Sequence, residues 1–134
     1  MLLSELIHIG SSLLVNLYPE REAREMVFAY MEDIFGFKRY KHVLEPEFKL
    51  LEAESERALA DFARMATGEP LQYVTGKAYF YGREFRVSPD VLIPRQDTET
   101  LVESVIVALH EFPEPDVLDL CAGSGAIGLS VKTL

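Results

Sequence analysis

Apolar residues recur every three or four positions through the first seventy residues, which is the spacing of amphipathic helices. Pro19 interrupts this pattern, and Gly36 and Gly68 are natural stops after the two clearest segments. Pro46 suits the first turn of the last segment. The pattern therefore predicts a small bundle of four or five helices joined by short connections. The predicted segments are residues 2–17, 21–35, 39–44 (a turn or short helix) and 46–67.

The pattern changes after Gly68, where short alternating runs replace the helical spacing. A short helix is expected over 71–74, and the runs 77–80 and 84–87 then flank a turn at 81–83. Two alternating runs around a glycine-containing turn predict a β-hairpin. Ala78 and Phe80 share one face, as do Phe85 and Val87. We expect the aromatic residues Phe80, Tyr81 and Phe85 to pack against the inner side of the hairpin, and a groove for a partner is the alternative.

A further helix and a short strand complete the pattern. Apolar periodicity predicts a helix that follows Asp97 and ends before Pro113, with Asp97 or Thr98 as its cap. The run 117–120 predicts a buried parallel strand, and 126–132 predicts the first turns of a helix. The expected fold class is α+β: an N-terminal helical bundle, a β-hairpin linker, and the first helix, strand and loop of a Rossmann-like α/β domain.

The composition indicates a folded protein and narrows the classes of function. Hydrophobic residues make up 49% of the 134 residues, which is ample material for a core. No apolar stretch approaches the roughly 18 residues of a membrane span, and no basic leader precedes the first apolar segment. The net charge of -9 argues against nucleic acid, and the single cysteine excludes a disulfide framework or zinc cluster. We expect a cytoplasmic protein with no membrane, metal or direct nucleic-acid partner.

The most informative chemistry lies in the segment VLDLCAGSGAIG, residues 117–128. In α/β folds such a turn binds ligands, because glycines allow positive φ and the N–H groups of the following helix point at the ligand. The spacing Gly123-x-Gly125-x-x-Gly128 also fits a dinucleotide site. Asp119 would repel a pyrophosphate but attract the sulfonium and ammonium groups of S-adenosylmethionine. This favours S-adenosylmethionine over NAD, and a tight turn without a ligand is the third alternative.

Two motifs at a fixed separation give the chain a family resemblance. LIPRQDTE at 92–99, followed by VLDLCAGSGAI at 117–127, closely resembles the HemK or PrmC family. The segment GEPLQYVTG at 68–76 also looks like the hairpin linker of that family. Its members are protein-(glutamine N5) methyltransferases that act on peptide chain release factors. The helical first half is similar to the family in length and architecture rather than by motif.

The resemblance implies three parts and a cofactor. Residues 1–75 would form a helical substrate-recognition domain, 76–90 a β-hairpin linker, and 91–134 the truncated start of an S-adenosylmethionine-dependent methyltransferase domain. The partner would be the glutamine-bearing loop of a release factor. The implied cofactor-binding residues are Asp119, Cys121, Ala122, Gly123, Ser124 and Gly125, and the implied cleft residues are Pro94 and Arg95.

Two of these positions carry open alternatives. Arg95 would contact cofactor or substrate, or else pair with a nearby carboxylate such as Asp97 or Glu99. Cys121 departs from the glycine that many methyltransferases carry there, and its small side chain is tolerable if the backbone need not take positive φ. Methyl transfer to an amide needs no thiol nucleophile, so Cys121 is not expected to react.

The mechanism of the family sets an expectation for this chain. In that family an Asn-Pro-Pro-Tyr segment orients the glutamine amide, and the 134 residues contain no such segment. We therefore expect the chain to be the N-terminal portion of a release-factor glutamine methyltransferase, with no catalytic residue of its own and weak binding of cofactor. The alternatives are a methyltransferase with another amino acceptor and a stand-alone protein-interaction module.

Overall fold

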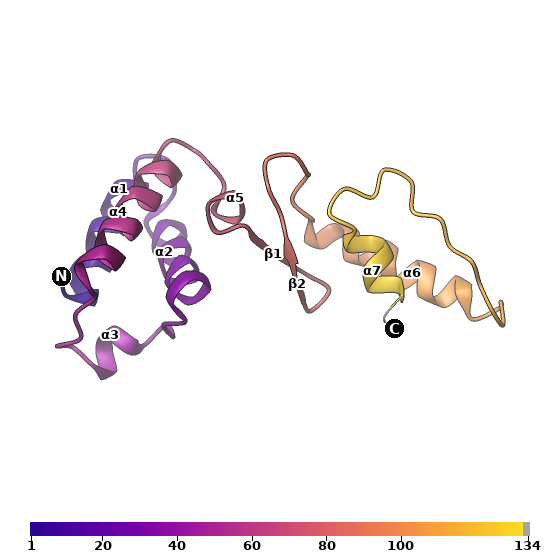
Figure 1. The fold of residues 1–134 in the computed structure, drawn as a ribbon, viewed down its shortest axis with the longest axis horizontal. Helices are drawn as coiled ribbons and strands as arrows, with labels where there is room; N and C mark the ends of the chain where they lie inside the picture. Colours follow the sequence, from indigo (N-terminus) through magenta and orange to yellow (C-terminus); the bar gives the residue numbers. More distant parts are fainter. Residues whose placement is uncertain (133–134) are drawn as a thin grey trace. The chain divides into compact units, whose positions relative to one another are not determined.

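The computed structural model describes residues 1–132, so the last two positions of the predicted 91–134 segment lie outside the described residues. Contacts divide the chain into two compact units, Met1–Thr75 and Gly76–Leu134, called here the helical unit and the C-terminal unit. Figure 1 shows the elements of each. The helical unit contains α1 (Leu3–Leu14), α2 (Glu20–Phe35), α3 (Lys41–Leu44), α4 (Glu52–Ala66) and α5 (Leu71–Thr75). The C-terminal unit contains β1 (Lys77–Phe80), β2 (Arg83–Arg86), the 3-10 turn η1 (Gln96–Thr98), α6 (Glu99–Leu109) and α7 (Ala126–Lys132).

The helical unit is built on a core of its own, which confirms the predicted bundle. Helix α1 packs against both α2 and α4, as Figure 1 shows. Gly10 allows the close approach of α1 and α4, since a Cβ atom there would lie 2.8 Å from the ring of Phe62. The Tyr30 ring meets the Phe62 ring edge-on at 4.9 Å. The most deeply buried residues of this core are Leu6, Leu14, Ala23, Val27, Tyr30, Met31, Ala58, Phe62 and Met65.

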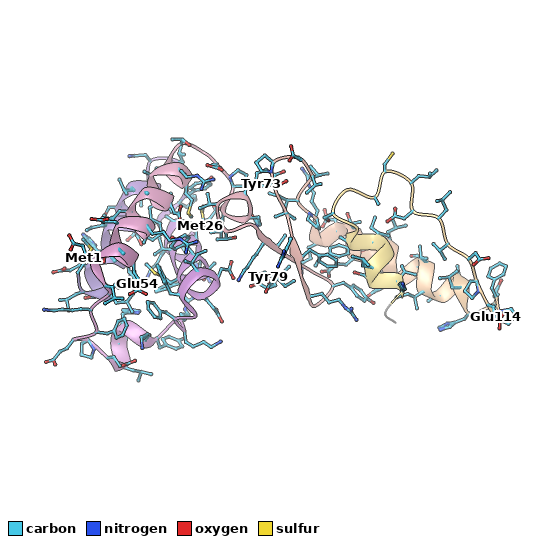
Figure 2. All side chains as sticks on the ribbon, in the orientation of Figure 1. Met1, Met26, Glu54, Tyr73, Tyr79 and Glu114 are labelled. Carbon is cyan, nitrogen blue, oxygen red and sulfur yellow. The ribbon has the colours of Figure 1, made fainter. Side chains whose placement is uncertain are left out.

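The sequence predicts the end of one helix correctly and the start of another incorrectly. Helix α2 stops at Gly36, which takes φ +71°, as a left-handed C-terminal stop requires. The helix predicted from Pro46 begins only at Glu52, so that boundary was wrong. The preceding backbone is used elsewhere, because Phe48 accepts a hydrogen bond from the Leu3 amide at 3.0 Å. The Glu54 side chain (Figure 2) then accepts from the Leu51 amide at 2.9 Å and starts α4.

The predicted β-hairpin forms, but its second strand is Arg83–Arg86 rather than the predicted 84–87. Strands β1 and β2 are antiparallel, with Ala78 opposite Phe85 and Phe80 opposite Arg83. The connection is therefore a two-residue loop of Tyr81 and Gly82, which take φ +50° and +73°. One face of the hairpin is buried, as the alternation predicts. Its buried residues are Ala78, Phe80 and Phe85, and Val87 continues the same face beyond β2.

The hairpin and α6 share the core of the C-terminal unit. Val102 of α6 is buried against Phe80, Phe85 and Ala126. Figure 1 shows α7 beside α6, in agreement with their contacts. The predicted cap at Asp97 or Thr98 is wrong, because neither end of η1 nor the start of α6 has a side-chain cap hydrogen bond. Thr98 has helical φ and ψ of -71° and -16°, so the 3-10 turn leads straight into α6.

The strand predicted over 117–120 does not form among residues 1–132, whose two-stranded sheet is β1 and β2. A strand needs a partner for its backbone groups, and this run has none in the described part of the chain. The predicted burial is also wrong, because Val117, Leu118 and Leu120 are 53%, 80% and 76% exposed. Val117 and Asp119 line a cavity beside α6 and α7. Glu114 marks the connection that leads from α6 toward this run (Figure 2). The α+β class is confirmed at the level of a helix-rich chain with one hairpin.

Candidate functional site

A cleft in the C-terminal unit brings the two sequence motifs together. Its volume is about 200 Å³. The first wall is Phe80 at the end of β1, the second is the extended segment 92–95 with Thr98, and the third is the glycine-rich loop. Six of the eight predicted site residues line it. They are Pro94, Arg95, Cys121, Ala122, Gly123 and Ser124.

The glycine-rich loop has a backbone that few side chains tolerate. Gly123 and Gly125 take φ +58° and +83°, which glycine adopts without a steric penalty. A Cβ atom on Gly123 would meet no atom within 4 Å, so the backbone at this point is open to an approaching molecule. Cys121 also takes φ +58°, contrary to the condition under which its side chain was expected to be tolerated. The turn therefore holds a residue with a side chain in a conformation that favours glycine.

The structure places Asp119 and Gly125 outside the lining of this cleft. Asp119 accepts a hydrogen bond from the Gly128 amide at 3.1 Å and so satisfies an N–H group in the first turn of α7. It also lines a separate cavity of about 400 Å³ beside α6 and α7. Gly125 donates its amide to the Ala122 carbonyl at 2.9 Å and closes the turn. Both residues therefore stabilise the loop without lining the cleft.

Arg95 lies on the rim of the cleft with its side chain exposed. No ion pair within 4.0 Å joins it to Asp97 or Glu99 in the described part of the chain. The Arg95 carbonyl accepts a hydrogen bond from the Thr98 amide at 3.0 Å, which forms the turn η1. A guanidinium at this position can meet a carboxylate or carbonyl oxygen of a molecule in the cleft.

Glu99 has a role that sequence reasoning missed. Its carboxylate accepts a hydrogen bond at 2.8 Å from the amide of Tyr81, at the tip of the hairpin. The available signal was an acidic residue in the first turn of a helix, which suggests only an interaction with the helix dipole. The partner is eighteen positions away in sequence, so no local pattern reveals it.

The helical unit carries a polar groove of about 730 Å³. Arg24 and His42 lie on its α2 and α3 sides, and both contact the Phe28 ring: Arg24 over its face at 5.3 Å and His42 stacked at 5.5 Å. Arg39 also covers this ring and binds Glu25, and that hydrogen bond lowers the pKa of the Glu25 carboxyl. The groove is lined by Ser4, Ile7, His8, Ser11, Ser12, Val15, Tyr18, Pro19, Glu20, Arg24 and His42.

A partly buried polar contact joins α2 to α4. Tyr30 donates its hydroxyl to Asp61 at 2.5 Å, and Asp61 lies between Arg57 and Arg64 at 3.8 and 3.7 Å. Burial, followed by the hydrogen bond to Asp61, raises the pKa of the Tyr30 phenol well above its usual value. Arg64 binds Glu69 beyond the end of α4 and lowers the pKa of that carboxyl. The contact between Tyr30 and Asp61 thus joins α2, which lines the groove, to α4, which does not.

Comparison with known proteins identifies the family of the helical half. Residues 5–76 match the family model of the PrmC N-terminal domain. The chain belongs to this family. The PrmC N-terminal domain thus covers nearly all of the helical unit and ends where β1 begins. Among residues 1–132 no helix combines the length and the apolar character that crossing a bilayer requires.

The similarity to individual proteins extends past the PrmC N-terminal domain. A release factor glutamine methyltransferase of Burkholderia pseudomallei is 45% identical over 98 residues, which cover 73% of this chain and 34% of that protein. The enzyme of the same name from Bordetella pertussis is 51% identical over 84% of this chain and 40% of its own length. The Enterococcus faecalis enzyme is 34% identical over 96% and 45%. The chain therefore spans between a third and a half of the length of these three relatives.

Proposed function

We propose that this chain is the N-terminal part of a release factor glutamine methyltransferase. On this proposal the helical unit recognises the release factor, and the C-terminal unit supplies part of the site where S-adenosylmethionine and the glutamine meet. The observation that carries the proposal is the cleft in which Pro94 and Arg95 face the loop 121–124. The two motifs that carry the family resemblance thus line one cavity.

The loop residues fit a nucleoside-type methyl donor. The open backbone at Gly123 lets the molecule approach closely, and Ser124 adds a hydroxyl beside it. Asp119, behind the loop, would act on a sulfonium or ammonium group through its negative charge rather than by direct contact. S-adenosylmethionine, when bound, supplies the methyl group. The residues of this chain bind and orient it.

The cleft is too small to hold the whole cofactor. Pockets for ligands of this size usually measure about 300–1,000 Å³, whereas this cleft measures about 200 Å³. The nitrogen of a glutamine amide is a weak nucleophile, so its methylation depends on positioning by groups around it. The described residues provide one side of such a site. We therefore propose that the chain alone binds the cofactor weakly and does not catalyse the transfer.

A titration of the 15N-labelled chain with S-adenosylmethionine tests the proposed cofactor site. We expect weak binding, in the millimolar range, with chemical-shift changes at Arg95 and the loop 121–125. Gly123→Ala should weaken the response, because its φ of +58° is unfavourable for alanine. Gly68→Ala, at φ +99° in the helical unit, is the matched control and should leave the titration unchanged.

Two results would count against this site. Shift changes confined to the helical unit would show that the loop does not bind the cofactor. Micromolar affinity would contradict the proposal that the chain contributes only one side of the site.

The helical unit is proposed to bind the release factor through its groove. This unit has its own core, and the relatives that carry it are named for that substrate. A binding assay of residues 1–75 with a purified release factor tests the assignment. Arg24→Glu in the groove should weaken binding by several-fold, and Arg21→Glu, exposed on the same helix but outside the groove lining, is the control. Equal effects of the two would argue against the groove.

A further inference from the structure

We infer that Glu99 is a positioning residue of the cleft, acting through the tip of the β-hairpin. The inference rests on the proposed function of the cleft and adds a residue to it. Glu99 does not line the cleft itself. Its carboxylate accepts the Tyr81 amide at 2.8 Å, and the residue before Tyr81 is Phe80, which forms one wall.

The hairpin turn needs support from outside because of its sequence. Both loop residues, Tyr81 and Gly82, take positive φ, as the tightest hairpin turns require. Such turns prefer Asn-Gly or Gly-Gly, and a bulky aromatic residue in the first position is unfavourable. A hydrogen bond from the Tyr81 amide to a carboxylate stabilises this conformation and satisfies a partly buried donor.

Glu99 connects two walls of the cleft, the segment that ends at Thr98 and the hairpin that carries Phe80. It follows Thr98, which lines the cleft, and it lies one helical turn before Val102, which packs against Phe80 in the core. One face of α6 therefore contacts the hairpin at two points, through an apolar contact at Val102 and a hydrogen bond at Glu99. The spacing between Phe80 and the segment 92–98 depends on both.

A carboxylate suits this position better than a neutral side chain. Glu99 is the first residue of α6, where the helix dipole favours negative charge. A charged acceptor also forms a stronger hydrogen bond than a neutral one. Glutamine would keep an acceptor oxygen at the same reach, whereas alanine would remove it. The substitution pair therefore separates loss of the hydrogen bond from loss of charge.

Amide hydrogen exchange of the full chain measures the proposed contact. In Glu99→Ala we expect the Tyr81 amide to exchange on the order of tenfold faster or more, since one hydrogen bond to a charged group is removed. Glu99→Gln should recover most of the protection. Glu103→Ala, an exposed glutamate one turn further along α6, is the matched control and should leave Tyr81 unchanged.

The effect on the cleft is measured separately, from the amide signals of loop residues that Glu99 does not contact. In Glu99→Ala the amide signals of 122–124 should shift and the response to S-adenosylmethionine should weaken several-fold, with rescue in Glu99→Gln. A second rescue should come from Tyr81→Asn, because Asn-Gly forms this turn unaided. The double variant Tyr81→Asn, Glu99→Ala should therefore restore the signals of 122–124, and it also keeps the test possible if Glu99→Ala does not fold.

Three outcomes would overturn the inference. Unchanged exchange at Tyr81 in Glu99→Ala would remove the contact on which it depends. Faster exchange with unchanged signals at 122–124 would leave Glu99 as a support of the turn alone. A double variant as defective as Glu99→Ala would show that Glu99 does not act through the hairpin tip. Failure of the wild-type chain to respond to S-adenosylmethionine would instead contradict the proposed function, while the exchange results at Tyr81 would stand.

Discussion

Cys121 holds a backbone conformation that costs a residue with a side chain about 1–2 kcal/mol. Its φ of +58° matches that of Gly123 two positions later. Cys121→Gly should therefore stabilise the C-terminal unit by about 0.5–1 kcal/mol, because relief of the strain exceeds the added entropy of glycine in the unfolded chain. Thermal unfolding measures the change. Ala122→Gly, at a position without positive φ, is the control and should destabilise; a loss of stability in both variants would contradict this view of the loop.

Tyr30 predicts a dependence of stability on alkaline pH. Its phenol has a raised pKa in the folded chain, so its contribution to stability is complete below the usual value of 10.0 and is lost as pH rises above it. Tyr30→Phe should cost about 1.5–3 kcal/mol at pH 7, because the hydrogen bond to the Asp61 carboxylate is lost. The variant should also lose less stability than the wild type between pH 9 and 11. Urea unfolding measures both effects.

A control for the loss of stability at pH 7 is available on the surface of the same unit. Tyr40→Phe changes the same atom at a residue that is 65% exposed. At pH 7 it should therefore cost less stability than Tyr30→Phe. If Tyr40→Phe and Tyr30→Phe behaved alike, the partly buried contact to Asp61 would not be the source of the effect.

The contact between α1 and α4 predicts the effect of one methyl group. Alanine favours helix over glycine by about 1 kcal/mol, but the Cβ of Gly10→Ala would lie 2.8 Å from the Phe62 ring. Overpacking of this kind costs about 1–3 kcal/mol, so we expect a net loss of roughly 1 kcal/mol in thermal unfolding. Gly10→Ala combined with Phe62→Leu should lose less than the sum of the single variants. Ser12→Ala, exposed on α1, should be neutral or slightly stabilising.

Among the elements, those defined by local signals could be predicted from the sequence. Gly36 fixes the end of α2, and alternation with a tight turn fixes β1 and β2. The start of α4 could not be predicted, because Pro46 suits the first turn of a helix, whereas the main chain at Phe48 is held by a hydrogen bond from Leu3 near the N-terminus. At this position a tertiary hydrogen bond outweighs the local helix propensity.

The candidate site could likewise be predicted only in part. Sequence motifs identified six residues that line one cleft, because each motif is local. The motifs do not show that Asp119 is turned toward the Gly128 amide, that Cys121 takes positive φ, or that Glu99 reaches the hairpin. Each of these features depends on how a turn meets an element that packs against it. The spacing of residue types carries no information on such contacts.

At the scale of the whole molecule, the division at Thr75 predicts that the helical unit folds alone. Its core draws only on residues of Met1–Thr75, and α2 and α4 both pack against α1, with Gly10 meeting Phe62 at the contact with α4. Residues 1–75 should therefore show a cooperative transition and helical circular dichroism close to that expected from α1 to α5. A non-cooperative melt would contradict this. Tyr30→Phe in residues 1–75 should lower the midpoint as it does in the full chain.

The single thiol of the chain lies in the cleft and is exposed. A fluorine tag or spin label can therefore be attached at Cys121 without any engineered cysteine and without competing sites. Because Cys121 is flanked by the residues proposed to receive the cofactor, the attached probe would report occupancy of the loop directly. The departure from glycine at this position gives the protein a built-in reporter of its own candidate site.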